Sequence, residues 1–240
     1  MAGHSKWNNI KNRKGAQDAK RGQVFQKMSK EIFVAAKSGG PDPEMNPGLR
    51  LAIEKAKSVN VPNDIIKRAI DKSSGSGSEE NYDDVIYEGY GPGGVAVLVF
   101  CLTENRNRTA SNIRLAFSKN GGNLGESGSV GYMFERKGRL FIERTDDTDE
   151  DTVMMAALEA GAEDIQSTDE GFEIVTAAVD FLQVKESLEA EGIEFISAEI
   201  EMIPTMYTEI SEENEEKFEK MIDMLEDDDD VQDVYHNAGE

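Results

Sequence analysis

The chain has 240 residues, 38% of them apolar, and a formal net charge of −22. This length suits one large domain or two to three small ones. The longest unbroken apolar run, residues 95–102, is far shorter than the roughly 20 residues of a membrane-spanning helix. No apolar stretch follows the basic N-terminus as a secretory signal would require, so we expect a cytoplasmic protein with no membrane partner. Cys101 is the single cysteine, which excludes an internal disulfide and a Cys-cluster metal site.

Positive charge is concentrated near the N-terminus. Nine of the first 37 residues are Lys or Arg and two are acidic, so this segment carries +7 while the remaining 203 residues carry −29. Such a split is typical of a nucleic-acid-binding arm on an acidic body. Because phosphate repels the acidic part, binding should be oriented through the basic end. The nine basic residues are Lys6, Lys11, Arg13, Lys14, Lys20, Arg21, Lys27, Lys30 and Lys37.

The first 75 residues predict a small helical domain with a basic arm. Residues 1–17, here called the basic arm, show no apolar periodicity. A first helix is predicted over residues 19–37, a second begins with Asn46 as its cap, and a third begins at Pro62.

A Ser/Gly-rich linker at residues 73–78 precedes a change to strand patterns. Strands are predicted at residues 85–87 and 95–102, on either side of a glycine-rich turn. A helix over residues 106–119 and a strand over 129–134 complete a β-β-α-β unit.

The next block, residues 137–203, has the predicted order β-α-β-β-α-β, which is the split βαβ or ferredoxin-like motif. Its first helix is expected over residues 148–160, with Thr148 as its cap and Gly161 just past its end. The last 36 residues hold an acidic helix, residues 211–226, and a short segment, residues 231–235. These are too short to form a core alone, so we expect them to pack back onto the β-β-α-β unit.

The predicted fold class is therefore α+β with three domains. They are an N-terminal three-helix domain with the basic arm, a discontinuous α+β domain and an inserted ferredoxin-like βαββαβ domain. Their predicted boundaries are residues 1–75, residues 80–136 plus 204–240, and residues 137–203, respectively.

Several long segments resemble the YebC/PmpR family, which includes the mitochondrial translational activator of cytochrome c oxidase. They include MAGHSKWNNIK, IYEGYGPGGVAVLVFCLTENRNRTASNIRLAF and KNGGNLGESGSVGYMF. The resemblance spans the whole chain and implies one helical and two α+β domains without enzymatic activity. It implies either of two roles: a DNA-binding transcriptional regulator, or a ribosome-associated factor that helps translation through difficult, proline-rich stretches.

The basic arm supplies the first group of candidate binding residues. Lys6, Lys11, Arg13 and Lys14 would contact phosphates while Trp7 stacks on a base. Alternatively, Trp7 folds back and plugs the small helical domain.

The first helix supplies the second group. Lys20, Lys27 and Lys30 lie in one angular sector beside the apolar stripe, and Arg21 adjoins Lys20. This basic face would track a phosphate backbone, or it is an ordinary solvated face. No spacing demands a recognition helix, so backbone or shape recognition fits better than base-specific readout.

A third group lies at the start of the helix over residues 106–119. Arg106 and Arg108 follow asparagines there and offer donors to phosphate. The alternative is a capped loop whose arginines pair with nearby carboxylates.

The glycine-rich segments, residues 91–94 and 121–128, lack the Lys-Ser or Lys-Thr of a phosphate-binding loop. We expect tight turns there, or a close approach of the backbone to RNA. The acidic tail, residues 212–230, is expected to be a solvated helix whose end frays at Asp227 to Asp230. Alternatively, it docks on a basic surface or competes with nucleic acid for the basic arm.

Nothing in the sequence indicates catalysis. His4 and His236 are the only histidines and no metal-ligand cluster is present in the sequence. We therefore predict no enzymatic activity, no cofactor, no metal and no small-molecule substrate. The predicted role is a translation factor whose basic arm binds ribosomal RNA, and the alternative is a DNA-binding transcriptional regulatory protein that uses the helical domain.

Overall fold

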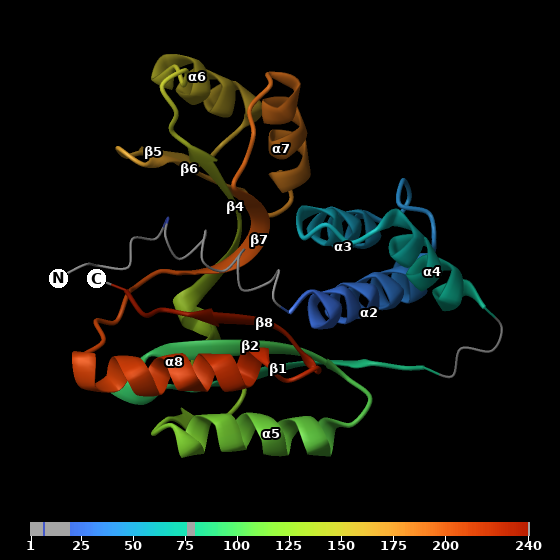
Figure 1. Cartoon of the computed structure of the whole chain (residues 1–240), viewed down its shortest axis with the longest axis vertical. Helices are drawn as coiled ribbons and strands as arrows, with labels where there is room; N and C mark the ends of the chain where they lie inside the picture. The colour runs from blue at the N-terminus through green and yellow to red at the C-terminus, as the bar shows by residue number, and fades with distance from the viewer. Residues whose placement is uncertain (1–6, 8–19, 76–79, 240) are drawn as a thin grey trace. The chain divides into compact units, whose positions relative to one another are not determined.

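The computed structural model describes residue 7, residues 20–75 and residues 80–239. These residues form an α+β structure with helices α2 to α8 and two sheets (Figure 1). The chain divides into two compact units. One takes in the described parts of residues 1–24, 54–61 and 136–201, and the other residues 25–53, 62–135 and 202–240. The division into three domains stays a prediction.

The N-terminal helices are α2 (Arg21–Gly39), α3 (Pro47–Ser58) and α4 (Asn63–Ser74). They start within two residues of the predicted positions. The Asn46 cap is confirmed, because its Oδ1 accepts a hydrogen bond from the backbone N–H of Leu49 at 3.0 Å. No helix among the described residues is long and apolar enough to cross a membrane.

The first sheet has the strand order β3-β1-β2-β8. β1 and β2 pair antiparallel along their whole length, and β8 pairs antiparallel with β2. The C-terminal segment thus closes this sheet, as expected from its inability to form a core of its own. The four strands are β1 (Asp83–Tyr90), β2 (Ala96–Thr103), β3 (Asn123–Leu124) and β8 (Val231–His236).

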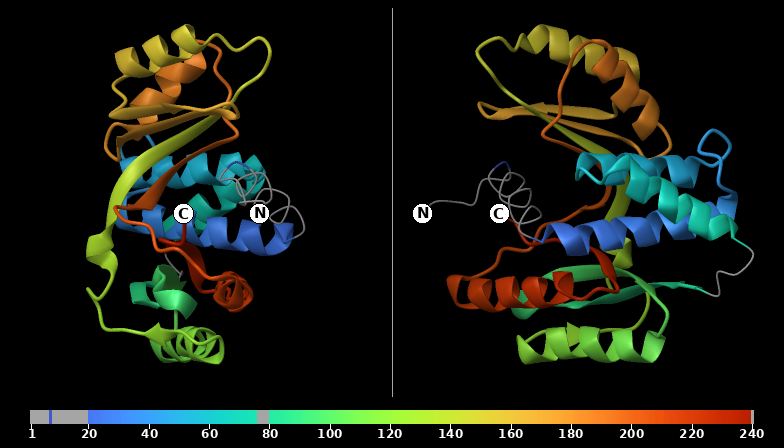
Figure 2. Two further views of the ribbon diagram at one scale, coloured as in Figure 1. Left: turned by 90° about the vertical axis from the view of Figure 1, so that its left-hand side faces the viewer. Right: turned by 45° about the vertical axis from the view of Figure 1, so that its right-hand side comes forward.

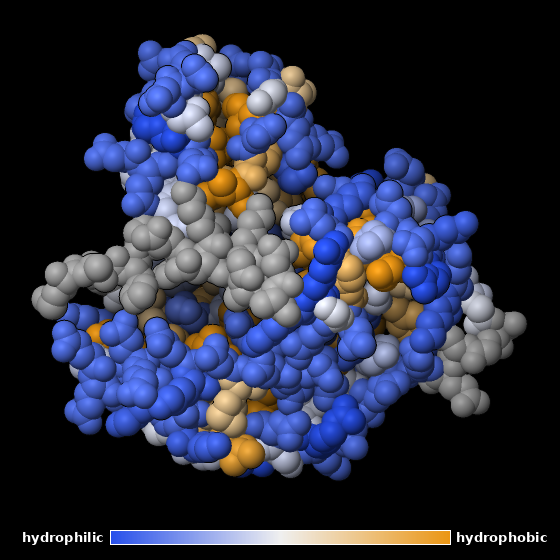
Figure 3. All heavy atoms as spheres, in the orientation of Figure 1, coloured by the Kyte–Doolittle hydropathy of each residue, from blue (hydrophilic) through white to orange (hydrophobic). Residues whose placement is uncertain are grey.

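Two helices cover one face of the first sheet: α5 (Arg106–Lys119) and α8 (Glu212–Glu226) (Figure 1). Their inward residues, among them Phe117 and Leu225, bury the β2 face that carries Val97. Burial of this apolar area is the main stabilising contribution here. The outer surface over α8 is hydrophilic, as Figure 3 shows.

The strand predicted over residues 129–134 is wrong. Gly131–Met133 is a 3-10 turn, and the next strand, β4 (Phe134–Glu143), starts where the predicted one ends. The sheet edge is formed instead by the two-residue strand β3, which pairs with Gly89 and Tyr90 of β1. So short an edge strand carries no apolar alternation that a sequence could reveal.

The second sheet has the order β5-β6-β4-β7, and its elements follow one another as β4-α6-β5-β6-α7-β7. This is the split βαβ order that the sequence indicated. Figure 2 shows α6 and α7 on the same side of this sheet. The new elements are α6 (Glu150–Ala160), β5 (Asp164–Ser167), β6 (Gly171–Ala177), α7 (Phe181–Ala190) and β7 (Ser197–Pro204).

The two faces of β4 have different neighbours. A Cβ on Gly138 would come within 2.9 Å of Phe181, so the even-numbered residues of β4 face α7. The odd-numbered Arg139 and Phe141 therefore lie on the face turned away from α7, here called the outer face of the second sheet. The predicted cap at Thr148 is wrong, because Asp149 occupies the N-cap position of α6.

Candidate nucleic-acid interface

The basic arm carries four of the basic residues predicted to bind nucleic acid. Lys6, Lys11, Arg13 and Lys14 lie outside the described residues, so their contact with phosphate stays a prediction. Lys20 and Arg21, at the start of α2, are both exposed.

Trp7 is described, and it is buried with 7% of its surface exposed. Its ring packs edge-on against Phe141 of β4, with 5.3 Å between the centroids and 82° between the planes. This differs from the predicted plug in the helical domain, since the indole lies on the second sheet. The buried indole is also not presented for stacking on a base in this structure.

Lys27 and Lys30 of α2 are bound to protein acceptors. The Lys27 Nζ donates to the carbonyl of Glu226 at 2.6 Å, and the Lys30 Nζ donates to the carbonyls of Asp229 at 2.8 Å and Leu102 at 3.2 Å. Burial lowers the pKa of Lys27 below its ordinary value, although four nearby carboxylates oppose that shift. Both ammonium groups thus satisfy carbonyls at and beyond the C-terminal end of α8, where the helix dipole also favours cations.

The contacts of Lys27 and Lys30 differ from the ordinary solvated face that was the alternative expectation. A solvated face would leave them exposed, yet the Lys30 side chain is 14% exposed. To contact phosphate, Lys27 and Lys30 would first have to release the carbonyls that they now bind. Their binding to nucleic acid stays a prediction, whereas their present partners explain how α2 is held against the turn after α8.

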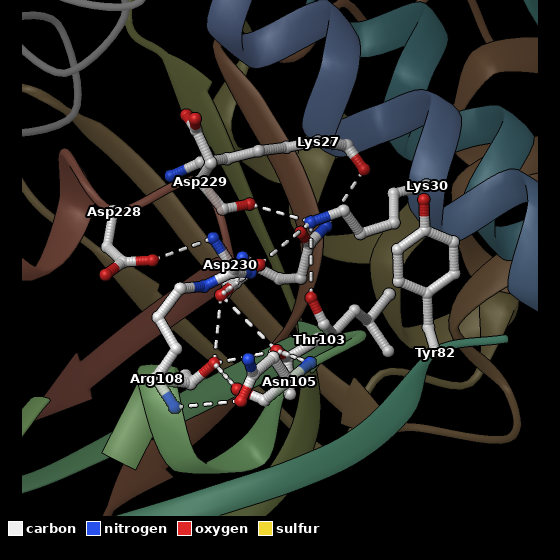
Figure 4. Close-up of polar contacts among 12 residues, drawn as sticks. Lys27, Lys30, Tyr82, Thr103, Asn105, Arg108, Asp228, Asp229 and Asp230 are labelled. Carbon is white, nitrogen blue, oxygen red and sulfur yellow. Dashed lines mark hydrogen bonds and ion pairs between the residues drawn. The ribbon is translucent and has the colours of Figure 1, made fainter. Parts of the chain in front are cut away.

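Asp230 is the centre of this polar cluster (Figure 4). Its Oδ2 accepts from Arg108 Nη2 at 2.8 Å and from Thr109 Oγ1 at 2.9 Å, and Lys30 Nζ lies 3.7 Å from its Oδ1. Burial alone would raise the pKa of Asp230, but the hydrogen bonds from Arg108 and Thr109 and the nearby positive charges lower it below the ordinary value. The carboxylate therefore stays ionised, and both of its oxygens interact with donors or cations of the protein.

The arginines at the start of α5 behave as the capped-loop alternative describes. Asn105 caps the helix, because its Oδ1 accepts from the backbone N–H of Arg108 at 3.1 Å. Arg106 Nε lies 2.9 Å from Asp83 Oδ2, and Arg108 pairs with Asp230. Both arginine side chains are more than half exposed, and phosphate contact by them stays a prediction.

The expected fraying of the acidic tail at Asp227 to Asp230 is wrong. Asp230 is buried, and the turn is stabilised by Lys27, Lys30 and Arg108. Asp230 was missed because its partners lie more than 100 residues away along the chain, where no spacing rule applies.

A second buried carboxylate, Glu88 of β1, binds the turn in which the glycine-rich segment 121–128 ends. It accepts hydrogen bonds from the backbone N–H groups of Gly128 at 2.8 Å, Val130 at 2.9 Å and Gly131 at 2.7 Å. Although burial opposes it, these bonds lower the pKa of Glu88. Glu88 thus holds the turn at residues 128–131, whereas residues 123–124 of the glycine-rich segment form strand β3. No group of metal-ligating side chains occurs among the described residues.

Two protein-family models match the chain. Residues 5–76 match the model described as the TACO1/YebC protein N-terminal domain, and residues 82–238 match the TACO1/YebC second and third domain. The chain belongs to the TACO1/YebC family. The resemblance seen in the sequence is therefore confirmed at the level of the family.

Similar proteins cover this TACO1/YebC chain from end to end. It is 61% identical to a probable transcriptional regulatory protein of Geobacillus sp. (strain WCH70), over 100% of this chain and 98% of that one. It is 60% identical to a probable transcriptional regulatory protein of Listeria monocytogenes serotype 4b (strain F2365), over 99% of each chain.

A solved structure has the same fold as this TACO1/YebC chain. The crystal structure of a conserved hypothetical protein from Aquifex aeolicus superposes with a TM-score of 0.80, at 46% identity. The match covers 92% of this chain and 91% of that one.

Proposed function

We propose that this TACO1/YebC protein is a non-enzymatic, nucleic-acid-binding regulator of gene expression. Its basic arm and the start of α2 bind ribosomal RNA, and the bound protein aids translation of difficult, proline-rich stretches. The observation that carries the proposal is the charge asymmetry: +7 in the first 37 residues of a chain whose net charge is −22. Such a protein contacts a polyanion with one end and is repelled elsewhere.

Four of the basic residues predicted to bind nucleic acid have partners within the protein. Lys27, Lys30, Arg106 and Arg108 have protein acceptors or carboxylate partners. The proposal rests first on the arm residues Lys6, Lys11, Arg13 and Lys14, because residues 1–17 contain no acidic side chain. Lys20 and Arg21, which follow the arm in the sequence, are exposed. Point charges on an arm suit backbone contacts and do not supply base-specific readout.

The experiment is co-sedimentation of the native protein with ribosomes from a DNase-treated lysate at near-physiological salt. The proposal predicts that the protein pellets with ribosomes or a subunit. It also predicts that the triple variant Lys11→Ala, Arg13→Ala, Lys14→Ala stays in the supernatant. Pelleting of the triple variant to the same extent as the native protein would assign the contact to another surface.

The second candidate function is a DNA-binding transcriptional regulatory protein. It is favoured by the names of the relatives from Geobacillus and Listeria. A regulator should lose about 1–3 kcal/mol of binding free energy per wrong base pair, whereas a ribosome binder should be indifferent to DNA sequence. Retention on one promoter fragment over its scrambled version, without pelleting with ribosomes, would establish this alternative.

A further inference from the structure

The Trp7 indole is buried against Phe141 and Gly171 on the outer face of the second sheet, and this site is here called the Trp7 seat. Its ring packs edge-on against Phe141, and 7% of the tryptophan surface is exposed to solvent. A Cβ on Gly171 would come 2.6 Å from Cη2 of Trp7, so the absence of a side chain at this position makes room for the indole. The seat therefore accommodates the indole between the Phe141 ring and the bare backbone of Gly171.

Charged side chains surround this seat. The guanidinium of Arg139 lies 4.9 Å from the Phe141 centroid and is bound by Glu173 at 2.5 Å and Glu201 at 3.2 Å. Glu143 pairs with Gly171 and Glu173 pairs with Phe141 across the sheet, so both carboxylates lie on the outer face. The rim of the seat is therefore predominantly acidic.

The segment that carries Trp7 has the opposite charge. The basic arm, residues 1–17, has four Lys or Arg and no acidic side chain, so it carries +4. Residues 137–203 hold nineteen acidic and four basic side chains, a net charge of −15. Opposite charges within a Debye length attract each other, and Lys6 is the direct neighbour of Trp7 in the sequence.

We propose that the outer face of the second sheet is a docking site for the chain's own basic arm, with Trp7 as its anchor, and that nucleic acid draws the arm off this site. The inference rests on the proposed function, because the arm is the segment that we propose to bind RNA. Phosphate and the acidic sheet compete for the same positive charges. The apparent affinity for RNA is then lowered by the fraction of molecules whose arm is docked.

Trp7 is the only tryptophan of the chain, so its fluorescence reports on the docking directly. The full-length protein is titrated with a 20-nucleotide single-stranded RNA of mixed sequence, labelled with fluorescein. Anisotropy measures binding, and acrylamide quenching of the Trp7 emission is measured in parallel with unlabelled RNA. We expect a blue-shifted, poorly quenched emission in the free protein, and a several-fold rise in quenching that follows the binding curve.

A pair of matched variants separates docking from general stability. Phe141→Leu keeps an apolar residue but removes the aromatic contact, so quenching in the free protein should rise and RNA affinity should increase two- to tenfold. Phe172→Leu makes the same change in the neighbouring strand, on the other face of the sheet. It should leave the Trp7 emission and the RNA affinity unchanged, even where it lowers the melting temperature as much.

The outcomes are distinguishable. RNA binding that leaves the quenching of Trp7 unchanged would overturn the exchange, as would equal RNA affinities of Phe141→Leu and the native protein. Strong quenching of Trp7 in the free protein would overturn the docking itself. If the protein binds neither this RNA nor ribosomes, the proposed function is wrong, and so is the displacement of the arm by nucleic acid. Acrylamide quenching of Trp7 in the free protein would still show whether the arm docks.

Discussion

Arg108 and Asp230, which are 122 residues apart in the chain, form an ion pair with 2.8 Å between Nη2 and Oδ2. The pair joins the first turn of α5 to the turn that follows α8. Asp230 also accepts a hydrogen bond from Thr109, and its side chain is 8% exposed. The buried carboxylate therefore satisfies the hydrogen-bonding groups of Arg108 and Thr109 that point at it.

Replacement of Asp230 by Asn should therefore destabilise the protein. The amide removes the negative charge and turns an NH2 group toward donors, so we expect a loss of about 1–3 kcal/mol in the free energy of unfolding. Urea unfolding at neutral pH measures it. Glu219→Gln, on the exposed side of α8, removes the same charge without a buried contact and should change stability by less than about 0.5 kcal/mol. Equal effects of the two variants would show that only net charge matters.

The two buried carboxylates predict how stability depends on pH. The folded-state pKa values of Asp230 and Glu88 lie below their ordinary values of 3.8 and 4.5. As the pH falls, the unfolded chain therefore takes up protons before the folded one. Both groups stabilise the fold above these ordinary values, and this stabilisation is lost as the pH falls through the lowered folded-state values.

Urea unfolding of the native protein and of Glu88→Gln, between about pH 6 and pH 3, checks this sign. The variant should show a flatter decline of stability toward acid, because one of the linked groups is gone. Parallel declines in the two proteins would show that Glu88 does not contribute to the pH dependence.

Periodicity and capping rules predicted most helices because their signals are local. The bounds of α5 were predicted as observed, and Asn46 caps α3 through the N–H of Leu49. The strand order of the second sheet followed from the order of its elements. These features depend on neighbours a few residues apart, which a sequence displays directly.

The remaining features depend on residues far apart in the chain. Asp230 looked like part of a solvated acidic run because its donors, Lys30 and Arg108, lie in distant segments. Trp7 could be predicted to be either stacked or buried, but nothing local indicated Phe141 as its neighbour. Glu88 likewise gave no signal, because the groups that it binds are backbone amides.

Glu88→Gln should loosen the glycine-rich segment that the carboxylate holds. A glutamine offers one acceptor oxygen to three backbone N–H groups and turns its own NH2 toward the others, so we expect a loss of about 1–3 kcal/mol in stability. Hydrogen exchange of the amides of Gly128, Val130 and Gly131 should become faster than in the native protein. Glu126→Gln, an exposed residue of the same segment, is the matched control and should leave these rates unchanged.

The salt dependence of RNA binding distinguishes the basic arm from α2. Each phosphate contact of single-stranded RNA contributes about 0.7 to the slope of log K against log salt. The triple variant Lys11→Ala, Arg13→Ala, Lys14→Ala should therefore flatten the slope by about 2 and weaken binding to all sequences alike.

The double variant Lys27→Ala, Lys30→Ala should leave the slope nearly unchanged, because both ammonium groups are bound to carbonyls around the end of α8. It should instead lower the stability of the protein, since those carbonyls lose their donors. Anisotropy titrations at several salt concentrations, with urea unfolding alongside, measure both effects. A flattened slope in the double variant, with stability unchanged, would show that Lys27 and Lys30 contact RNA. It would also show that their bonds to the carbonyls at the end of α8 contribute little to stability.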